Sequence, residues 1–504
     1  MNKRRRKKTN MKNIGQYIEN EIKESVQTEE NRYLSILRKA NGSDLSWMEE
    51  YGRTISEEEK ETAAFYFLYP KEKICKMAEH IVEAFLHGFI SQNRERKGRK
   101  RVRLFYQVGQ EALAACVADC LLKNGLKPVV IDPMLPERPK KEQLYLDEIS
   151  EEMISQLYDR AFLKYKEEAL DVCGMIGIGQ FGKPDTETQS KERKMLERGR
   201  RLVEDSYVQP ATISFSKVAF PSLQIGDNFH EIFDEVFEMN LEESEKFEKI
   251  QQILIDALDR CKSVRIIGKK PNQTSLNVQM QPIRDPQRET NFMNCGGDLN
   301  IPYGEVFTTP QLKGTTGVLH IPDIYLQNRK YHNLKLWFED GQIADYSSEA
   351  EGQETKELIR EELLSPYETL PAGEFAIGTN TRAFRICKKY HLEDKMPILI
   401  YEKMGPHLAI GDPCYRGGEE EAVYNLLDGK EITARTNEKT RNEDSDDKKY
   451  VQKHIDITLP YDEIEELYGY GKEGETIKII KDGKFVLPGT DELNLGMEER
   501  RQEA

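Results

Sequence analysis

The feature that most constrains the fold of this chain is a regular alternation of strand-like and helix-like segments that starts at Arg101. "RVRLFYQ" alternates as a strand does, "GQEALAACVADCLLKNG" has the periodicity of an amphipathic helix, and "KPVVID" is a short apolar strand. The same rhythm continues as far as residue 262. Strands that alternate with helices favour a parallel sheet covered by helices, so we predict an α/β domain over residues 96–262.

The segments on either side of this region have a different texture. Residues 1–95 are polar and helix-leaning, and we treat them as an N-terminal extension; their best helix is "EKICKMAEHIVEAFLHGF". After Ser263, β-rich segments with Gly and Pro turns replace the long helices. The expected fold class is therefore an α/β domain with a parallel sheet, followed by a β-rich α+β domain over residues 263–504.

Composition and charge exclude several classes of function. The 504 residues include 89 acidic and 74 basic side chains, and a net charge of −15 opposes nucleic-acid binding. No apolar run approaches the roughly 18 residues that cross a membrane. The eight cysteines are scattered without a CxxC pair, and the basic start of the chain lacks the apolar stretch of a secretory signal. We therefore expect a cytoplasmic protein.

Six carboxylate and imidazole side chains occupy compact contexts in the C-terminal region. They lie in "NIPYGEVFTTP", "LPAGEFAIGTNT", "YEKMGPHLAIGDPCY" and "KHIDITLP". A carboxylate among apolar strand residues is costly to bury unless it is paired or bound to a metal. Two imidazoles with several carboxylates suit zinc, cobalt or manganese, and more than four candidates leave room for two ions. The candidate metal ligands are Glu305, Glu374, Glu402, His407, His454 and Asp456.

Several of these patterns have a plainer interpretation. An H-x-D pair on a strand also occurs at surfaces, and His407 at the start of "LAIG" fits a core histidine. The charged stretch 433–449 predicts a surface loop, either inert or lying over the site. "GIGQFG" matches a dinucleotide pattern, but Pro184 follows almost at once, so we interpret it as a turn at a strand end. For Cys295 and Cys414 the sequence identifies no base that would make either one a nucleophile.

Taken together, these segments resemble the metalloaminopeptidase family of aminopeptidase T and aminopeptidase S, the thermophilic-type leucyl aminopeptidases. The resemblance covers about residues 95–504. It rests on "NIPYGEVFTTP" followed by "GVLHIPD", on "GEFAIGTNT", "E-x4-HLAIG" and "HIDI", and on "VRLFYQVGQEALAACVADCLLKNGLKPVV". It implies that the six candidates are the family's metal ligands. Tyr415 would be the family's tyrosine, although it falls one residue later than the family pattern has it.

The resemblance implies a metal-dependent aminopeptidase that releases bulky apolar N-terminal residues from peptides. Two divalent ions (Zn, Co or Mn) would share Glu374 and activate a water, and Tyr415 would donate a hydrogen bond to the developing oxyanion. The family is typically dimeric, so a homodimer is expected. Two alternatives stay open from the sequence. One is a metal-dependent amidohydrolase of a small non-peptide substrate, and the other is a non-catalytic binding protein that keeps the fold.

Overall fold

A computed structural model describes most of the chain and separates it into two compact units. Unit 1 consists of Met1–Gln180 and Thr186–Leu223, and unit 2 consists of Phe181–Asp185 and Gln224–Ala504. The described residues are 3–27, 31–40, 44–133, 149–182, 191–208, 212–296, 299–326, 329–350, 353–354, 356–415, 421–439, 451 and 453–498.

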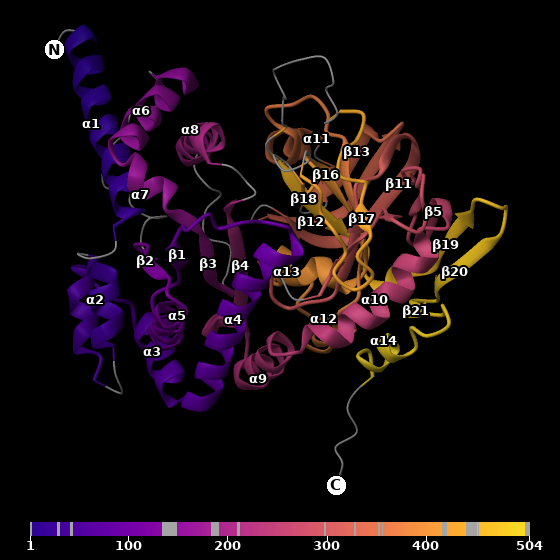
Figure 1. The fold of residues 1–504 in the computed structure, drawn as a ribbon, viewed down its shortest axis with the longest axis horizontal. Helices are drawn as coiled ribbons and strands as arrows, with labels where there is room; N and C mark the ends of the chain where they lie inside the picture. The colour runs from indigo at the N-terminus through magenta and orange to yellow at the C-terminus, as the bar shows by residue number, and fades with distance from the viewer. Residues whose placement is uncertain are drawn as a thin grey trace. The chain divides into compact units, whose positions relative to one another are not determined.

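Unit 1 is built around a sheet whose strands follow the order β2-β1-β3-β4 (Figure 1). The central β1 (Arg101–Phe105) runs parallel to both β2 (Lys127–Val130) and β3 (Val172–Phe181), and β4 spans Ser214–Pro221. Parallel neighbours need a crossover connection, and α5 (Glu111–Lys123) supplies it between β1 and β2. The predicted parallel α/β arrangement is confirmed at this level.

The other helices of unit 1 pack onto this sheet or form a second core. α4 packs against α5 and β4, and it buries the face that its periodicity predicts, including Phe85 and Phe89. Ile14 and Ile18 of α1 join a buried cluster with Phe162 of α6. The bounds are α1 Lys3–Glu24, α2 Arg32–Lys39, α3 Glu57–Leu68, α4 Lys71–Ser91, α6 Glu151–Lys164, α7 Lys166–Leu170 and α8 Lys191–Tyr207.

The two units differ from the domains expected from the sequence. Residues 1–95 were expected to be an extension, yet α1 and α4 are part of the core of unit 1. The expected boundary between 96–262 and 263–504 also differs, because unit 2 already includes α9 (Phe229–Asn240) and α10 (Ser244–Leu258). These helices pack on elements of unit 2. Helical periodicity reveals that a helix has a buried face, but not which sheet that face covers.

Among the described residues, unit 2 contains two antiparallel sheets and a two-stranded parallel pair of β7 and β17. The larger follows the order β14-β13-β12-β11-β6-β5-β19-β20-β21, and the smaller, called the site sheet below, follows β18-β16-β15-β10-β8. Figure 1 shows β16 and β18 side by side in orange. The strand bounds are β5 Cys261–Gly268, β6 Ser275–Gln279, β7 Glu289–Thr290, β8 Met293–Cys295, β9 Leu299–Asn300, β10 Glu305–Thr308, β11 Gln311–Leu326, β12 Arg329–Glu339, β13 Gln342–Ala350, β14 Gln353–Glu354, β15 Ala372–Gly378, β16 Pro406–Gly411, β17 Glu431–Ile432, β18 His454–Thr458, β19 Ile464–Gly471, β20 Thr476–Lys481 and β21 Lys484–Phe485.

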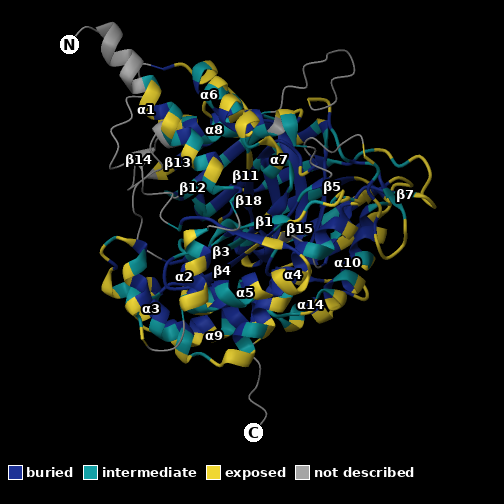
Figure 2. Cartoon of the chain, turned by 60° about the vertical axis from the view of Figure 1, so that its left-hand side comes forward, coloured by how far each residue is buried: buried dark blue, intermediate teal, exposed yellow. Residues whose placement is uncertain are grey.

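The site sheet is buried, and short helices connect its strands. Every residue of β15 and β16 is buried, and Figure 2 shows β15 and β18 within the dark blue interior. Gln251 of α10 ties that helix to the sheet. Its amide nitrogen donates to the Cys295 carbonyl at 3.1 Å, and its amide oxygen accepts from the Thr379 hydroxyl at 2.7 Å. The helices after β14 are α11 Lys356–Ile359, α12 Thr381–Tyr390, α13 Ile398–Tyr401 and α14 Glu492–Leu495.

Three further expectations can be compared with the structure. Gly177 and Gly179 lie inside β3, which continues to Phe181, so only the third glycine of "GIGQFG" stands at a strand end and the predicted turn was wrong. Residues 440–449 of the charged stretch lie outside the described residues. Within the described ranges, no helix combines the length and apolarity that a membrane span requires.

Candidate metal centre

The strand register places five of the six candidate side chains on one face of the site sheet. Glu374 pairs with Ala409, and Ala409 pairs with Asp456, so these three residues form one row across β15, β16 and β18. Residues two apart on a strand point to the same side. His407 and His454 therefore share the face of Ala409 and Asp456, and Glu305, opposite Gly378, shares the face of Glu374.

Small residues between these side chains leave room for them on that face. Reading along β15, Glu374 is followed at alternate positions by Ala376 and Gly378, and His407 on β16 is followed by Ala409 and Gly411. Gly411 faces His454 across the strands and has a φ of 112°. A Cβ at this position would come within 2.1 Å of the Lys453 carbonyl, so only glycine lets β18 approach.

The sixth candidate comes from a turn that packs against the sheet. Glu402 and Lys403 belong to the 3₁₀ turn Glu402–Met404, which follows α13. A Cβ on Gly378 would lie 2.4 Å from the Glu402 carbonyl oxygen, so the glycine is what lets this turn reach β15. Asn300 donates to Oε1 of Glu402 at 3.2 Å.

The six candidates converge into what we call the carboxylate–histidine cluster. Nε2 of His407 lies 2.8 Å from Oε1 of Glu305 and 3.4 Å from Oε1 of Glu374. Nε2 of His454 lies 3.2 Å from Oδ1 of Asp456 and 3.8 Å from Oε2 of Glu374. Glu374 thus has one oxygen toward each histidine. The cluster comprises Glu305, Glu374, Glu402, His407, His454 and Asp456.

Backbone carbonyls orient both imidazoles toward the carboxylates. Nδ1 of His407 faces the Gly405 carbonyl at 3.3 Å, and Nδ1 of His454 faces the Asp412 carbonyl at 2.7 Å. A carbonyl only accepts, so Nδ1 carries the hydrogen in each ring and Nε2 is the atom presented to the cluster. Metal-binding histidines are commonly held in this way.

Lys403 is the one permanent cation that these contacts place within the cluster. Its side chain is 5% exposed, and its ammonium contacts Oε2 of Glu305 and lies 2.9 Å from Oε1 of Glu402. Burial by itself lowers the pKa of Lys403, but the two carboxylates outweigh it and raise that pKa well above its usual value. Four carboxylates against one ammonium leave an excess of three negative charges if the histidines are neutral.

Burial and the neighbouring charges of both signs shift the pKa values of the other groups in the cluster. Burial raises the pKa of Glu402 to about 7 against the opposing effect of Lys403. For Glu305, burial favours the neutral form, but Lys403 and His407 outweigh it and lower the pKa to about 2. Burial lowers the pKa of both imidazoles, yet contacts with Glu305, Glu374 and Asp456 raise the pKa of His407 and the Asp456 contact raises that of His454. The cluster therefore attracts cations, and protons are one such cation.

The donor set fits divalent ions. Among the described residues, two groups of three side chains have ligand atoms that all lie within 4.8 Å of one another. One is Glu305, Glu374 and His407, and the other is Glu374, Cys414 and His454. Nε2 of His407 is buried without a hydrogen bond of good geometry, although carboxylates surround it. Oxygen and imidazole ligands suit zinc, cobalt or manganese, and buried carboxylates in excess are stable only when cations neutralise them.

The structure places Cys414 and Tyr415, which lie in the loop after β16, in different surroundings. Cys414 is exposed, and its Sγ lies 2.5 Å from Oε2 of Glu374 and 3.9 Å from Nε2 of His454. Tyr415, the expected catalytic residue, is buried with its ring centroid 5.7 Å from that of Phe307. Its hydroxyl has no hydrogen-bond partner among the described residues. At this end of the cluster, Cys414 is thus the residue in contact with Glu374 and His454.

Sequence reasoning did not identify Lys403 or Cys414 as members of the site. Lysine is usually exposed, and nothing in "YEKMG" distinguishes Lys403 from a surface residue. Cys414 was considered only as a nucleophile. The available signal was its position near the end of the segment that carries Glu402 and His407, and this became informative only once Glu374 and His454 were placed beside it.

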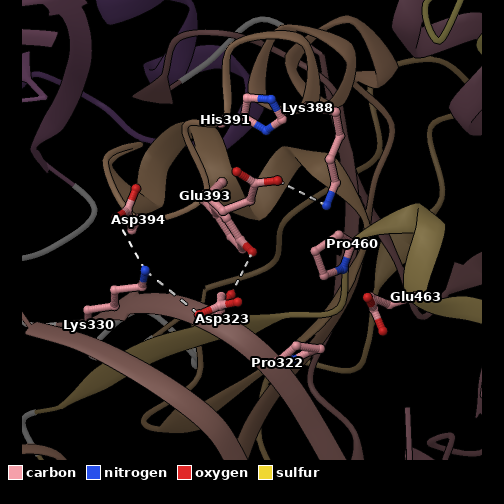
Figure 3. Close-up of a pocket in the computed structure, with 10 residues that line it drawn as sticks. Pro322, Asp323, Lys330, Lys388, His391, Glu393, Asp394, Pro460 and Glu463 are labelled. Carbon is pink, nitrogen blue, oxygen red and sulfur yellow. Dashed lines mark hydrogen bonds and ion pairs between the residues drawn. The ribbon is translucent and has the colours of Figure 1, made fainter. Parts of the chain in front are cut away.

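A separate cavity of about 370 Å³ lies elsewhere in unit 2 and has a different character. Figure 3 shows that its two lysines are paired: Lys388 with Glu393, and Lys330 with Asp323 and Asp394. The lining has four carboxylates, including Glu463, and two lysines, and each of the lysines is paired. The cavity lining includes His391 but none of the six cluster residues.

The donor set is suited to divalent ions, and comparison with known proteins identifies the class of protein as a metal-dependent hydrolase. The family model described as "Thermophilic metalloprotease (M29)" matches residues 71–485. The solved structure of wild-type AmpT from Thermus thermophilus is similar in fold, with a TM-score of 0.54 and 16% identity, over 83% of this chain and 100% of that chain. No curated protein sequence matches the chain.

The chain belongs to the thermophilic metalloprotease family M29, the family of aminopeptidases T and S, and it is a metallo-aminopeptidase. The family match begins at residue 71, about 25 residues before the resemblance seen in the sequence. It therefore includes α4, the helix that packs against α5 and β4.

Proposed function

We propose that this protein releases N-terminal residues from peptides at a site with two divalent ions held by the carboxylate–histidine cluster. The observation that carries the proposal is that Glu374 belongs to both groups of potential ligands, with one oxygen toward His407 and the other toward His454. Glu305 and His407 would complete one position, and His454 with Asp456 would contribute to the other. Lys403 pairs with both Glu402 and Glu305 and so links these two carboxylates.

The chain's own residues would perform the remaining tasks of catalysis. Divalent ions supply a water of lowered pKa and polarise a peptide carbonyl when they are bound in such sites. Lys403 pairs with both Glu305 and Glu402 and so limits the repulsion between them. The Tyr415 hydroxyl is protonated at neutral pH and has no other partner among the described residues, so it is available to donate to an oxyanion.

Restriction to N-terminal residues would come from a direct contact with the α-amino group of the peptide. That group needs a carboxylate or a metal ion as its partner, and the cluster supplies carboxylates for this contact. His454 and Cys414 are the exposed members of this region, so the peptide would enter beside them.

A preference for bulky apolar side chains is supported by an apolar wall on the same face of the sheet. Phe307 and Ala376 share that face with Glu305 and Glu374, and Tyr415 packs on Phe307. The apolar cluster that contains them is Met293, Cys295, Phe307, Ala376, Tyr415, Val423 and Ile432.

The proposal is tested by hydrolysis of leucyl-p-nitroanilide and a leucyl peptide before and after chelation, with zinc, cobalt or manganese added back. We expect chelation to abolish turnover and metal to restore it, with about two ions per chain by elemental analysis. N-acetyl-leucyl-p-nitroanilide and aspartyl-p-nitroanilide should be poor substrates. No turnover with any of the three metals would refute the proposal, and equal cleavage of the acetylated substrate would indicate an amidohydrolase without N-terminal specificity.

The homodimer implied by the resemblance and the cytoplasmic location expected from the cysteines remain predictions. Light scattering of the purified full chain and fractionation of cells that express it would test them.

A further inference from the structure

Cys414 occupies a position that the proposed aminopeptidase function has not used. Its Sγ, Nε2 of His454 and Oε2 of Glu374 form a triangle with sides of 2.5, 3.8 and 3.9 Å. Thiolate, imidazole and carboxylate are the three protein ligand types that zinc binds. We propose that Cys414 is a metal ligand, and that with Glu374 and His454 it makes one of the two ion positions selective for zinc or cobalt.

The orientation of His454 supports this proposal independently of the cysteine. Its Nδ1 donates to the Asp412 carbonyl at 2.7 Å, so Nε2 is the atom directed at Cys414 and Glu374. A hydrogen bond from the other ring nitrogen to a carbonyl is the usual support of a metal-binding histidine.

The distances around Nε2 of His454 fit ligands of a common ion. Two ligands at tetrahedral angles on one zinc lie roughly 3.5 Å apart, close to the 3.8 and 3.9 Å observed from Nε2 to Oε2 of Glu374 and to Sγ. The third side, 2.5 Å between Sγ and Oε2, is shorter. Rotation of the exposed Cys414 side chain about its Cα–Cβ bond would lengthen it.

Charge gives a third reason. The four carboxylates and Lys403 carry three net negative charges, and a Cys414 thiolate brings the total to four, which two divalent ions neutralise. A free thiolate nucleophile beside Glu374 would be disfavoured because the two anions repel each other. On coordination the thiol proton leaves to solvent and no electron is transferred. The two ion positions then differ, because Glu305, Glu374 and His407 offer only oxygen and nitrogen.

This inference rests on the proposed two-ion function but is tested by its own readouts. The full-length protein and the variants Cys414→Ser, Cys414→Asp and Cys75→Ser are loaded with cobalt, and the thiolate-to-cobalt charge-transfer absorption is recorded. Cys75 is a matched control because it is a half-buried cysteine in unit 1. The band should be present in the wild type and in Cys75→Ser, and absent in both Cys414 variants.

Two further measurements accompany the spectrum. Zinc should slow iodoacetamide alkylation of Cys414, followed by peptide mass spectrometry, about tenfold or more without protecting Cys75. The affinity of the second ion position for zinc should be lower in Cys414→Ser than in wild type. Loss of a residue that only supports a ligand lowers metal affinity roughly 10- to 100-fold, so loss of a ligand should lower it by at least this factor. Cys414→Asp should keep a second ion but shift its preference from zinc toward manganese.

The outcomes separate this inference from the proposed function. A cobalt band that survives in Cys414→Ser, or zinc protection without any band in the wild type, would overturn the assignment of Cys414. The assignment would also be overturned if the protein bound two ions and cleaved peptides while zinc did not protect Cys414. In that case the proposed two-ion aminopeptidase function would stand without a thiolate ligand. Absence of bound metal and of peptide cleavage in the wild type would refute both proposals together.

Discussion

Each unit of this protein contains buried carboxylates, but the two units compensate the cost of this burial in different ways. In unit 1, Glu111 is fully buried and accepts hydrogen bonds from the Tyr51 hydroxyl at 2.8 Å and the Gly109 amide at 2.9 Å. Tyr51 is in turn 2.5 Å from the Tyr106 hydroxyl. Burial raises the pKa of Glu111 to about 7. A single carboxyl group with neutral donors can avoid the cost of burial by keeping its proton.

In the cluster of unit 2, the carboxylates cannot all avoid the cost of burial by keeping a proton. Glu305 is held ionised by Lys403 and His407, and several carboxylates lie within a few ångströms of two imidazoles. The comparison teaches that a buried carboxylate alone does not indicate a metal site. The indication comes from carboxylates that outnumber the permanent cations and from histidines with Nε2 directed among them.

The largest effect should separate these two kinds of carboxylate. Glu374→Gln removes the oxygen charge shared by both ligand groups, so kcat for leucyl-p-nitroanilide should fall about 10³-fold or more with every metal. Glu111→Gln keeps a neutral, hydrogen-bonded side chain in unit 1, and its kcat should stay within a few-fold of wild type. Full activity in Glu374→Gln would exclude the shared-carboxylate role.

The next effect concerns the buried cation. Lys403→Met removes the partner of Glu305 and Glu402, and loss of one member of a buried ion pair costs about 3–5 kcal/mol. The free energy of unfolding, measured with urea in the presence of EDTA, should fall by this amount. Added zinc should recover more stability in the variant than it adds to wild type, because the ions then provide the missing charge. Equal stability of variant and wild type in EDTA would contradict the role given to Lys403.

A smaller effect should appear in the pH dependence of stability. The pKa of Glu111 is about 7 in the folded protein, above its ordinary value. At a pH between the ordinary pKa and about 7, Glu111 is therefore protonated in the folded state and ionised in the unfolded state. The stabilisation is fully present below the ordinary pKa and is lost as the pH rises through about 7. From pH 5 to pH 8, wild type should therefore lose up to about 3 kcal/mol more unfolding free energy than Glu111→Gln. Parallel curves for the two proteins would show that Glu111 keeps the same protonation in both states.

The smallest effect concerns Tyr415. Tyr415→Phe removes only a hydroxyl without a partner among the described residues, so the melting temperature should stay close to that of wild type. If the hydroxyl donates to the oxyanion, kcat should fall about 10- to 100-fold with little change in metal content. An unchanged kcat would leave Tyr415 with a packing role against Phe307.

Local pattern was enough to predict much of the fold. The periodicity of α4 and α5, the alternation of β1 and the short apolar run of β2 each predicted the correct type of element. A buried face imposes such a pattern on a helix or a strand. The alternation in "HIDITLP" correctly indicated the strand that places His454 and Asp456 on one face. The unit boundary and the role of α1 were not predictable in this way, because they depend on which surfaces pack together.

The sequence by itself determined the chemical types of the candidate site, four carboxylates and two imidazoles in compact local contexts. Only the tertiary structure decided that Lys403 and Cys414 join them, and that Cys414 rather than Tyr415 contacts Glu374. The physical reason is that strand periodicity fixes which face a side chain occupies, whereas distances between strands, turns and loops depend on packing. The balance of charges in the site depends on which side chains the fold brings together, so it cannot be read from any single segment of the chain.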